Sequence, residues 1–475
     1  MEEEKKKELV RHYMERGHLV SLEFLESMQE TQLPQGDLVL HLPEEGIAGQ
    51  DVLIEKNPLQ IVESYGDEPG KREVEHFVDY FGARYKSMER LLKQRQELSN
   101  LISIGRAKKK REKETLSIIG MVSEKEFTKT KNLMLTLEDP TGSIKVLVSK
   151  NKPELYTTAK DVVLDEVIGV VGANGENIIF ANEVLWPDIP LTKELKKSQK
   201  EGYALFLSDL HVGSKNFLEK DFLKFVKWLN QETGNEHQKE IASKIGYIFI
   251  VGDLVDGCGI YPGQENDLEL KNISDQYQKV AELLAEIPKS IKLIICPGNH
   301  DAVRMSEPQP VFYKDFASGL HKMQNVVLVS NPSTINIHAD ETFPGFEVLM
   351  YHGYSFDYYI ANVDTIRNNG GYERADLVMK FLLQRRHLAP THTSTLYLPN
   401  PKRDPLVIER IPDFFVTGHI HKSSVANYRN ITLICGSCWQ SKTEYQEKKG
   451  HVPEPSRVPI VNLQTREVKI LRFGE

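Results

Sequence analysis

The sequence predicts an α/β protein in which a small β-barrel precedes a large unit of alternating strands and helices. Three observations carry this prediction. Residues 115–190 hold five short apolar runs separated by turn signals, with a helical stretch between the third and fourth runs. From Tyr203 onward, short apolar runs bounded by Gly or Pro alternate with helical patterns. The composition, 40% hydrophobic and 27% charged residues, is that of an ordinary folded chain.

Composition and charge exclude several classes of protein. The 475 residues suit roughly two to four domains. The net charge of −8 argues against a chain that coats nucleic acid by bulk charge, although a local basic patch remains compatible with it. No apolar run reaches about 18 residues, and the charged start Met-Glu-Glu-Glu-Lys-Lys-Lys lacks the apolar stretch of a signal peptide. We therefore expect a cytoplasmic protein with no membrane partner, whose four cysteines are thiols.

Residues 1–112 form a predicted N-terminal helical and mixed segment. A charged helix is expected over residues 1–30, and a stronger three- and four-residue periodicity predicts a helix over residues 72–100. The basic run Arg106-Ala-Lys-Lys-Lys-Arg-Glu-Lys113 is typical of a solvated linker, and a strip that contacts phosphates is the alternative.

Residues 113–192 are predicted to form an OB-fold barrel. Five strands with a helix between the third and fourth is the layout of that fold. It binds single strands in some proteins and docks partners in others, and both roles stay open here. The expected strands are Leu116–Val122, Leu133–Leu137, Ile144–Val148, Val167–Val171 and Ile178–Ala181, and the expected helix is Pro153–Ala159.

Residues 200–475 are predicted to form one α/β domain, in which five apolar runs each end in a polar cluster. In open α/β sheets, ligands bind at the carboxyl ends of the strands, so clusters placed there converge on one crevice. Residues two apart in extended chain point the same way, so one cluster can aim two groups at one place. The clusters are Asp209-Leu-His211, Asp253-Leu-Val-Asp256, Asn299-His300-Asp301, His352-Gly and His419-Ile-His421.

Carboxylate oxygens with imidazole nitrogens, and no cysteine, predict a site for divalent metal ions. This ligand set suits Mn²⁺ as well as Fe, Zn²⁺ or Ni²⁺. The candidate ligands are too many for one tetrahedral ion and suit two ions roughly 3.5–4 Å apart that share a carboxylate. Such a pair clamps a phosphate and lowers the pKa of a water between the ions, while a histidine outside the ligand set stabilises developing charge.

The five clusters, in this order, resemble the motifs of the calcineurin-like metallophosphoesterase family. The resemblance implies a two-sheet β-sandwich flanked by helices and a pair of ions, most simply Mn²⁺. Asp253 would bridge the ions and His300 would be the catalytic histidine, with Asp301 orienting it and Asp256 supporting a ligand. The other implied ligands are Asp209, His211 and His421 for the first ion and Asn299, His352 and His419 for the second.

The barrel directly ahead of this domain makes the chain similar to the small (B) subunits of replicative DNA polymerases. The stretches Leu398-Pro-Asn-Pro-Lys-Arg-Asp-Pro405 and Gly436-Ser-Cys-Trp-Gln-Ser441 also resemble that family. Eukaryotic members have degenerate metal sites, whereas every ligand position is filled here, as in the archaeal family D subunits. The resemblance implies a 3′→5′ exonuclease that proofreads DNA with a single-stranded 3′ end. It also implies a large catalytic subunit as partner, the sliding clamp as a further candidate partner, and a place at the nucleoid.

Several basic residues are candidates for DNA contact. Arg304 follows the Asn-His-Asp cluster directly and could touch phosphate. Arg385, Arg386, Lys402 and Arg403 flank the long insertion between the fourth and fifth clusters. A solvated helix and loop, or a basic lip that guides a DNA end, would each explain these four residues.

Two rival functions remain from the sequence. The first is an architectural polymerase subunit with relic metal sites. The second is another phosphoesterase, such as a break-repair nuclease, a cyclic-nucleotide phosphodiesterase or a phosphoprotein phosphatase. The phosphatases usually carry Gly-Asn-His-Glu, whereas Asp301 stands here, and the upstream barrel is foreign to them.

Overall fold

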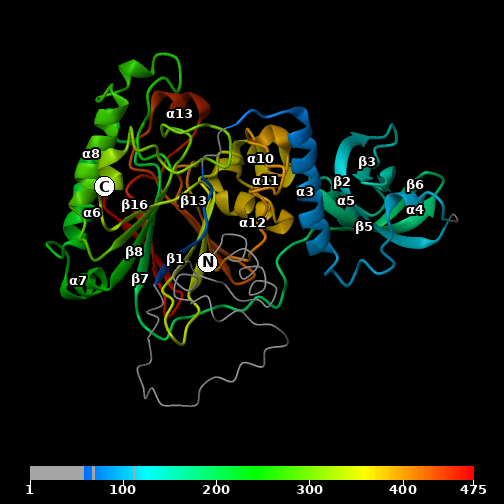
Figure 1. Ribbon diagram of the computed structural model, residues 1–475, viewed down its shortest axis with the longest axis horizontal. Helices are drawn as coiled ribbons and strands as arrows, with labels where there is room; N and C mark the ends of the chain where they lie inside the picture. The colour runs from blue at the N-terminus through cyan, green and yellow to red at the C-terminus, as the bar shows by residue number, and fades with distance from the viewer. Residues whose placement is uncertain (1–57, 67–69, 111–112, 475) are drawn as a thin grey trace, which may run out of the picture. The chain divides into compact units, whose positions relative to one another are not determined.

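The computed structural model describes residues 58–66, 70–110 and 113–474 (Figure 1). Residue contacts divide the chain into Met1–Glu55 and a compact unit, Lys56–Glu475, and only the second unit holds described residues. The helix predicted over residues 1–30 lies outside the described residues. Among the helices of the described ranges, none combines the length and the apolar character that crossing a membrane requires.

A closed barrel of five strands occupies residues 115–185 (Figure 1). Its spatial order is β2-β3-β4-β6-β5, and β2 closes the ring by pairing with β5. Inward residues such as Leu135 and Val146 are fully buried and alternate with outward ones. The barrel and its helix confirm the predicted layout of five strands. The elements are β2 (Thr115–Phe127), β3 (Leu133–Asp139), β4 (Gly142–Val148), α5 (Pro153–Ala159), β5 (Val167–Gly175) and β6 (Ile178–Leu185).

Helix α3 (Val74–Leu92) precedes the barrel and buries one stripe of its surface. It ends at Leu92 rather than near residue 100, because the chain then turns so that Leu98 packs on Gly169 of the barrel. A Cβ built on that glycine would lie 2.8 Å from Leu98 Cδ1. The short helix α4 (Ile104–Ala107) follows, and Lys110 of the basic run pairs with Glu114 at 3.1 Å.

Two six-stranded sheets form the larger part of the described chain. The first has the order β10-β9-β8-β7-β16-β17 and the second β1-β11-β12-β13-β15-β14. The first sheet consists of β7 (Tyr203–Leu207), β8 (Ile245–Val251), β9 (Lys292–Cys296), β10 (Val326–Leu328), β16 (Arg457–Asn462) and β17 (Val468–Arg472). The second consists of β1 (Leu59–Glu63), β11 (Ser333–Ile337), β12 (Phe346–Met350), β13 (Phe414–Thr417), β14 (Ser424–Tyr428) and β15 (Ile431–Cys435).

The two sheets face each other across an apolar core, and helices cover their outer faces. The ring of Phe206 in the first sheet stacks on that of Phe249, with the ring centroids 5.2 Å apart. Its centroid lies 6.0 Å from that of Phe414 in the second sheet. The first sheet packs against α6 (Glu219–Leu229), α7 (Glu236–Ser243) and α8 (Ile273–Ala285). The second packs against α10 (Phe356–Asn362), α11 (Asp364–Arg367) and α12 (Ala375–Arg385). Shorter elements are η1 (Gln264–Asn266), α9 (Ser318–His321), η2 (Gly371–Glu373), η3 (His392–Ser394) and α13 (Glu444–Lys449).

This architecture agrees with the predicted α/β class, in which two sheets are flanked by helices and a barrel comes first in the chain. The assignment to the calcineurin-like and OB-fold families stays a prediction, as do the domain boundaries at residues 112, 192 and 200.

Candidate metal centre

Five strand ends bring polar residues together at one edge of the facing sheets. In the first sheet β7, β8 and β9 run parallel, so their carboxyl ends lie at the same edge. In the second sheet β12 and β13 are parallel neighbours. Each of these strands is followed directly by one of the polar clusters that the sequence analysis singled out.

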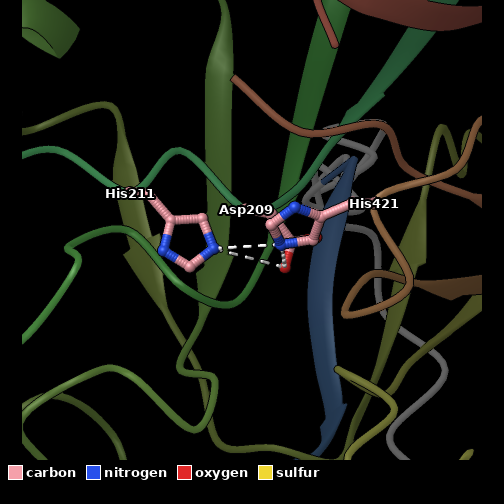
Figure 2. A group of neighbouring side chains, drawn as sticks. All are labelled: Asp209, His211 and His421. Atoms are coloured by element: carbon pink, nitrogen blue, oxygen red, sulfur yellow. Dashed lines mark hydrogen bonds and ion pairs between the residues drawn. The ribbon is translucent and has the colours of Figure 1, made fainter. Parts of the chain in front are cut away.

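Asp209, His211 and His421 form the first group of converging side chains (Figure 2). His211 Nε2 lies 3.1 Å from His421 Nε2, and Asp209 Oδ1 lies 4.0 Å and 3.5 Å from these two nitrogens. Two imidazole nitrogens and a carboxylate oxygen that point at one place are a ligand set for a divalent ion. Asp209 and His211 are buried, and His421 is partly exposed.

Asp253, His352 and His419 form the second group. Asp253 Oδ2 lies 3.3 Å from His352 Nε2 and 3.8 Å from His211 Nε2, so this carboxylate lies between the two groups. Asn299 Oδ1 lies 2.9 Å from His352 Nε2. The structure therefore brings all the predicted ligands together and places Asp253 where a bridging ligand is expected.

At Asp253 and His352, charge interactions outweigh the effect of burial on the pKa. Burial acts to raise the pKa of Asp253, but His352 and then His300 hold this pKa well below its usual range. Burial acts to lower the pKa of His352, but the Asp253 carboxylate raises it to about 10. A carboxylate and an imidazolium that stabilise each other in this way show that the site favours positive charge beside Asp253.

The backbone at the site adopts an uncommon conformation. Asp209, His211, Asp253, His419 and His421 all have φ between 52° and 68°. Residues with a side chain populate this left-handed region rarely, at a cost of about 1–3 kcal/mol each, and such residues concentrate at functional sites. The fold therefore holds these five side chains in place against a local preference.

Two glycines are required by close approach within the site. A Cβ on Gly252 would lie 2.2 Å from His352 Nδ1, and a Cβ on Gly298 would lie 2.2 Å from Asp253 Oδ1. Gly252 also has a φ of 82°. Any side chain at either position would displace a predicted ligand.

Partners outside the ligand set orient the imidazoles. Asp256 Oδ1 lies 3.1 Å from His211 Nδ1, which is the support that the sequence predicted for it. Asp357 Oδ2 lies 3.0 Å from His419 Nε2 and was not predicted, because a single aspartate on a helix carries no signal of its own. Burial acts to raise the pKa of Asp357, but His419 lowers it to about 2. Contacts of this kind fix the tautomer and the direction of a histidine ligand.

His300 lies beside the first group, whereas Asp301 does not orient it as predicted. The ring of His300 is 4.8 Å from that of His211, and its Nδ1 lies 2.8 Å from the carbonyl oxygen of Asp256. Asp301 instead accepts hydrogen bonds from the Gly298 and Leu254 amides and from the Tyr277 hydroxyl. Burial, followed by repulsion from Asp253, raises the pKa of Asp301 to about 7. Asp301 therefore fixes the loops around the site rather than the ring of His300.

The predicted basic lip does not include Arg385 and Arg386, because both are buried. Arg385 pairs with Glu166 at 2.6 Å, and Arg386 donates to the carbonyl oxygens of Ile408 and Glu409. Burial lowers the pKa of Arg386 to about 10. Both arginines therefore make contacts inside the protein, and neither side chain is exposed for contact with DNA.

The other three candidates for DNA contact have different surroundings. Lys402 and Arg403 are exposed, and the Arg403 guanidinium lies 4.7 Å from the ring of Tyr65. Arg304 is half-buried and donates to the carbonyl oxygen of Pro308 at 2.7 Å. Only Lys402 and Arg403 therefore remain candidates for an exposed basic lip.

Comparison with known proteins gives consistent matches to polymerase subunits. A family model for the B subunit of DNA polymerases alpha and epsilon matches residues 204–426. The DNA polymerase II small subunit of Pyrococcus furiosus is 37% identical over 424 residues, which are 89% of this chain and 67% of that protein. The same subunit of Methanothermobacter thermautotrophicus is 37% identical over 402 residues, which are 85% of this chain and 80% of that protein.

A further relative and one solved structure complete the comparison. The DNA polymerase II small subunit of Pyrococcus horikoshii is 39% identical over 416 residues, 87% of this chain and 65% of that protein. The chain thus spans about two thirds to four fifths of the length of these relatives. An archaeal phosphodiesterase structure aligns with 57% of this chain and 98% of its own, at 12% identity and a TM-score of 0.28.

Proposed function

Because the chain belongs to the archaeal DNA polymerase II small subunits, that is, the small subunits of family D polymerase, we propose that it is a metal-dependent 3′→5′ exonuclease and binds a large catalytic subunit. The observation that carries this proposal is the convergence of two carboxylates, one side-chain amide and four imidazoles at one edge of the sheets. A purely architectural subunit has no need to hold these groups in uncommon backbone conformations. The substrate class that we propose is DNA with a single-stranded 3′ end.

The residues of the site fit two divalent ions. In each group at least two imidazoles and one carboxylate offer ligand atoms toward one place, and Asp253 lies between the groups. Asp209, His211 and His421 would hold one ion, Asn299, His352 and His419 the other, and Asp253 both. Mn²⁺ is the ion that we propose, and Fe, Zn²⁺ or Ni²⁺ share the ligand chemistry. When bound, such a pair supplies a water of lowered pKa and positive charge beside a phosphate.

His300 is the residue that can deliver a proton at this site. Its Nδ1 faces the Asp256 carbonyl oxygen, which accepts a hydrogen bond from it, so the ring is held in one direction. In the described part of the chain, His300 Nε2 has no hydrogen-bond partner. The side chain is only partly buried, so Nε2 is accessible to a substrate. A proton held at Nε2 can therefore stabilise a phosphate oxygen or pass to the leaving 3′ oxygen.

We expect His300→Ala to slow DNA degradation by about 100- to 1000-fold while Mn²⁺ binding stays near normal, because this ring lies outside the ligand set. The measurement uses single-stranded DNA labelled at its 5′ end, with Mn²⁺, and reads the ladder of shortening from the 3′ end on a gel. His237→Ala, at an exposed histidine of α7, is the matched control. Normal degradation by His300→Ala would refute the assigned role, and shortening from the 5′ end would refute the polarity.

Removing the carboxylate behind His419 should weaken metal binding. We expect Asp357→Asn to lower the affinity for Mn²⁺ about 10- to 100-fold, because the His419 ring loses the partner that directs it. Titration calorimetry with Mn²⁺ measures this change. Asp364→Asn, an equal change at a half-exposed aspartate of the neighbouring helix α11, should leave the affinity unchanged. Equal affinities for both variants would show that Asp357 plays no part in binding.

A substrate panel separates the proposed function from its rivals. Single-stranded DNA, duplex DNA, a cyclic nucleotide and a phosphopeptide would each be incubated with the chain and Mn²⁺. The proposal expects single-stranded DNA to be degraded fastest. Metal content below one ion per chain and no hydrolysis of any substrate would instead favour the architectural subunit.

A further inference from the structure

Asp256 connects a proposed metal ligand with the proposed catalytic histidine. Its carboxylate oxygen Oδ1 lies 3.1 Å from His211 Nδ1, and its carbonyl oxygen lies 2.8 Å from His300 Nδ1. Asp256 is buried, yet within the described ranges no lysine or arginine pairs with its carboxylate. A buried carboxylate needs hydrogen-bond donors in place of water. The donors around Asp256 therefore decide how firmly both histidines are held.

The first donor is the fully buried side chain of Gln264, the first residue of η1. Its Nε2 donates to the Asp256 carbonyl oxygen at 2.9 Å and to Asp256 Oδ2 at 3.1 Å. Its Oε1 accepts from the Ile260 amide at 2.9 Å. Because a backbone N–H can only donate, the oxygen end of the side chain must face Ile260 and the nitrogen end must face Asp256. Gln264 thus holds both the carboxylate and the carbonyl group that is bonded to His300.

The second donor is Gln440, which comes from a distant part of the chain, shortly after β15. Its Nε2 donates to Asp256 Oδ1 and to Ser214 Oγ, both at 2.9 Å, and its side chain is buried. Because a carboxylate can only accept, the nitrogen end of this amide must face Asp256. Gln440 belongs to the stretch Gly436-Ser-Cys-Trp-Gln-Ser441, to which the proposed mechanism assigns no role. Its contact with Asp256 gives this stretch a place in the site.

Neutral donors suit this position because the proposed site must hold cations. Amides satisfy the buried carboxylate without adding a positive charge that would repel the ions. A lysine or arginine in the same place would also compete with His211 for Asp256. Because Oδ1 is bonded to one amide and Oδ2 to the other, the carboxylate cannot turn away from His211 without breaking these bonds.

We propose that Gln264 and Gln440 are positioning residues of the metal centre, which act through Asp256. Both amides hold the carboxylate against His211, and Gln264 also fixes the carbonyl oxygen that holds His300. Among the described residues, neither amide is hydrogen-bonded to a proposed ligand. The inference rests on the proposed function and divides it between the two residues. Gln440 serves ion binding alone, whereas Gln264 serves both ion binding and proton delivery.

The first test measures ion binding by the full chain. Gln264→Met and Gln440→Met each replace a buried amide by a side chain of similar length that cannot donate. In calorimetric titration with Mn²⁺, each variant should bind one of the two ions about tenfold more weakly and the other ion normally, because only His211 depends on Asp256. Asn325→Leu is the matched control, since this buried amide donates to a carbonyl oxygen beside the start of β9, away from the site. Both of its affinities should stay normal.

The second test separates the roles of the two glutamines. The rate at which single-stranded DNA is degraded is measured against the concentration of Mn²⁺. Gln440→Met should need about ten times more Mn²⁺ to reach half of the maximal rate, but its maximal rate should equal that of the unaltered chain. Gln264→Met should in addition stay about tenfold slower at saturating Mn²⁺, because the carbonyl group that directs His300 has lost its support. Equal maximal rates of the two variants would overturn this division of roles.

The third test needs no metal ion. In EDTA, urea unfolding compares Gln440→Met, Asp256→Leu and the double variant, whose effects on the free energy of unfolding should be less than additive because both substitutions remove the same contact. Additive effects, normal Mn²⁺ affinities in both glutamine variants, or an equal loss in Asn325→Leu would overturn the inference. If the unaltered chain bound no Mn²⁺, the proposed nuclease would be overturned instead, so the two failures are distinguishable.

Discussion

Asp253→Asn is expected to reduce DNA degradation on the order of a thousandfold or more, equal to about 4 kcal/mol of transition-state stabilisation. Asp253 is the carboxylate between the two groups, 3.3 Å from His352 and 3.8 Å from His211, so its loss affects both proposed ions together. The amide of asparagine has nearly the same shape but no charge. A neutral oxygen cannot hold two cations at one place.

The fold should survive this substitution. Asp253 Oδ1 accepts a hydrogen bond from the His300 amide at 2.8 Å, and an asparagine oxygen can accept the same bond. Circular dichroism and thermal unfolding should therefore match the unaltered chain, whereas metal analysis should find fewer bound Mn²⁺ ions. Asp275→Asn, at an exposed aspartate of α8, is the control with the same chemical change and should keep full activity. Normal degradation by Asp253→Asn would show that the metal assignment is wrong.

The second large effect is expected at a buried charge network that anchors helix α3. Asp404 accepts hydrogen bonds from Arg84 Nε and the Tyr80 hydroxyl, both at 2.6 Å, and lies 2.8 Å from His387 Nε2. The side chains of Arg84 and Asp404 are 1% and 0% exposed. When one partner of a buried ion pair is removed, the other is left as an uncompensated charge in the interior.

Asp404→Asn should therefore lower the free energy of unfolding by about 3–5 kcal/mol, measured by urea titration. Asp376→Asn breaks the ion pair between Asp376 and Arg374, whose side chain is 50% exposed, and should change the free energy of unfolding by about 1 kcal/mol or less. Equal effects of the two substitutions would contradict the anchoring role of Asp404.

The same network should make the fold sensitive to acid. Burial acts to raise the pKa of Asp404, but Arg84 holds it well below its usual range, so its contribution is complete at neutral pH and is lost as the pH falls. Burial and then Arg84 lower the pKa of His387 from 6.5 to about 4. Between these values the unfolded chain binds a proton that the folded chain does not, so the free energy of unfolding also falls with pH across this window.

The sequence by itself determined the order of the elements and the polar side chains that converge at one edge of the sheets. The barrel could be predicted because its strands are short apolar runs separated by turn signals. Both kinds of signal depend only on residues that are close together in the sequence. These side chains could be predicted because each follows an apolar run, and parallel strands place their carboxyl ends at one edge. That rule needs no knowledge of the distances between Asp209, Asp253 and His421, so the convergence could be expected before any geometry was known.

Only the tertiary structure decided which charges are buried and which group orients which. Arg385 and Arg386 look like a solvated basic pair in the sequence, but α12 packs against the second sheet and Glu166 of the barrel meets Arg385. Asp301 is next to His300 in the sequence, yet its carboxylate accepts hydrogen bonds from backbone amides and a tyrosine hydroxyl. His419 is instead oriented by Asp357, which lies on helix α10 far away in the sequence. Periodicity records which face of one element is apolar. It does not show which other element of the chain packs against that face. The packing of that other element decides which side chains are buried and which hydrogen bonds they make.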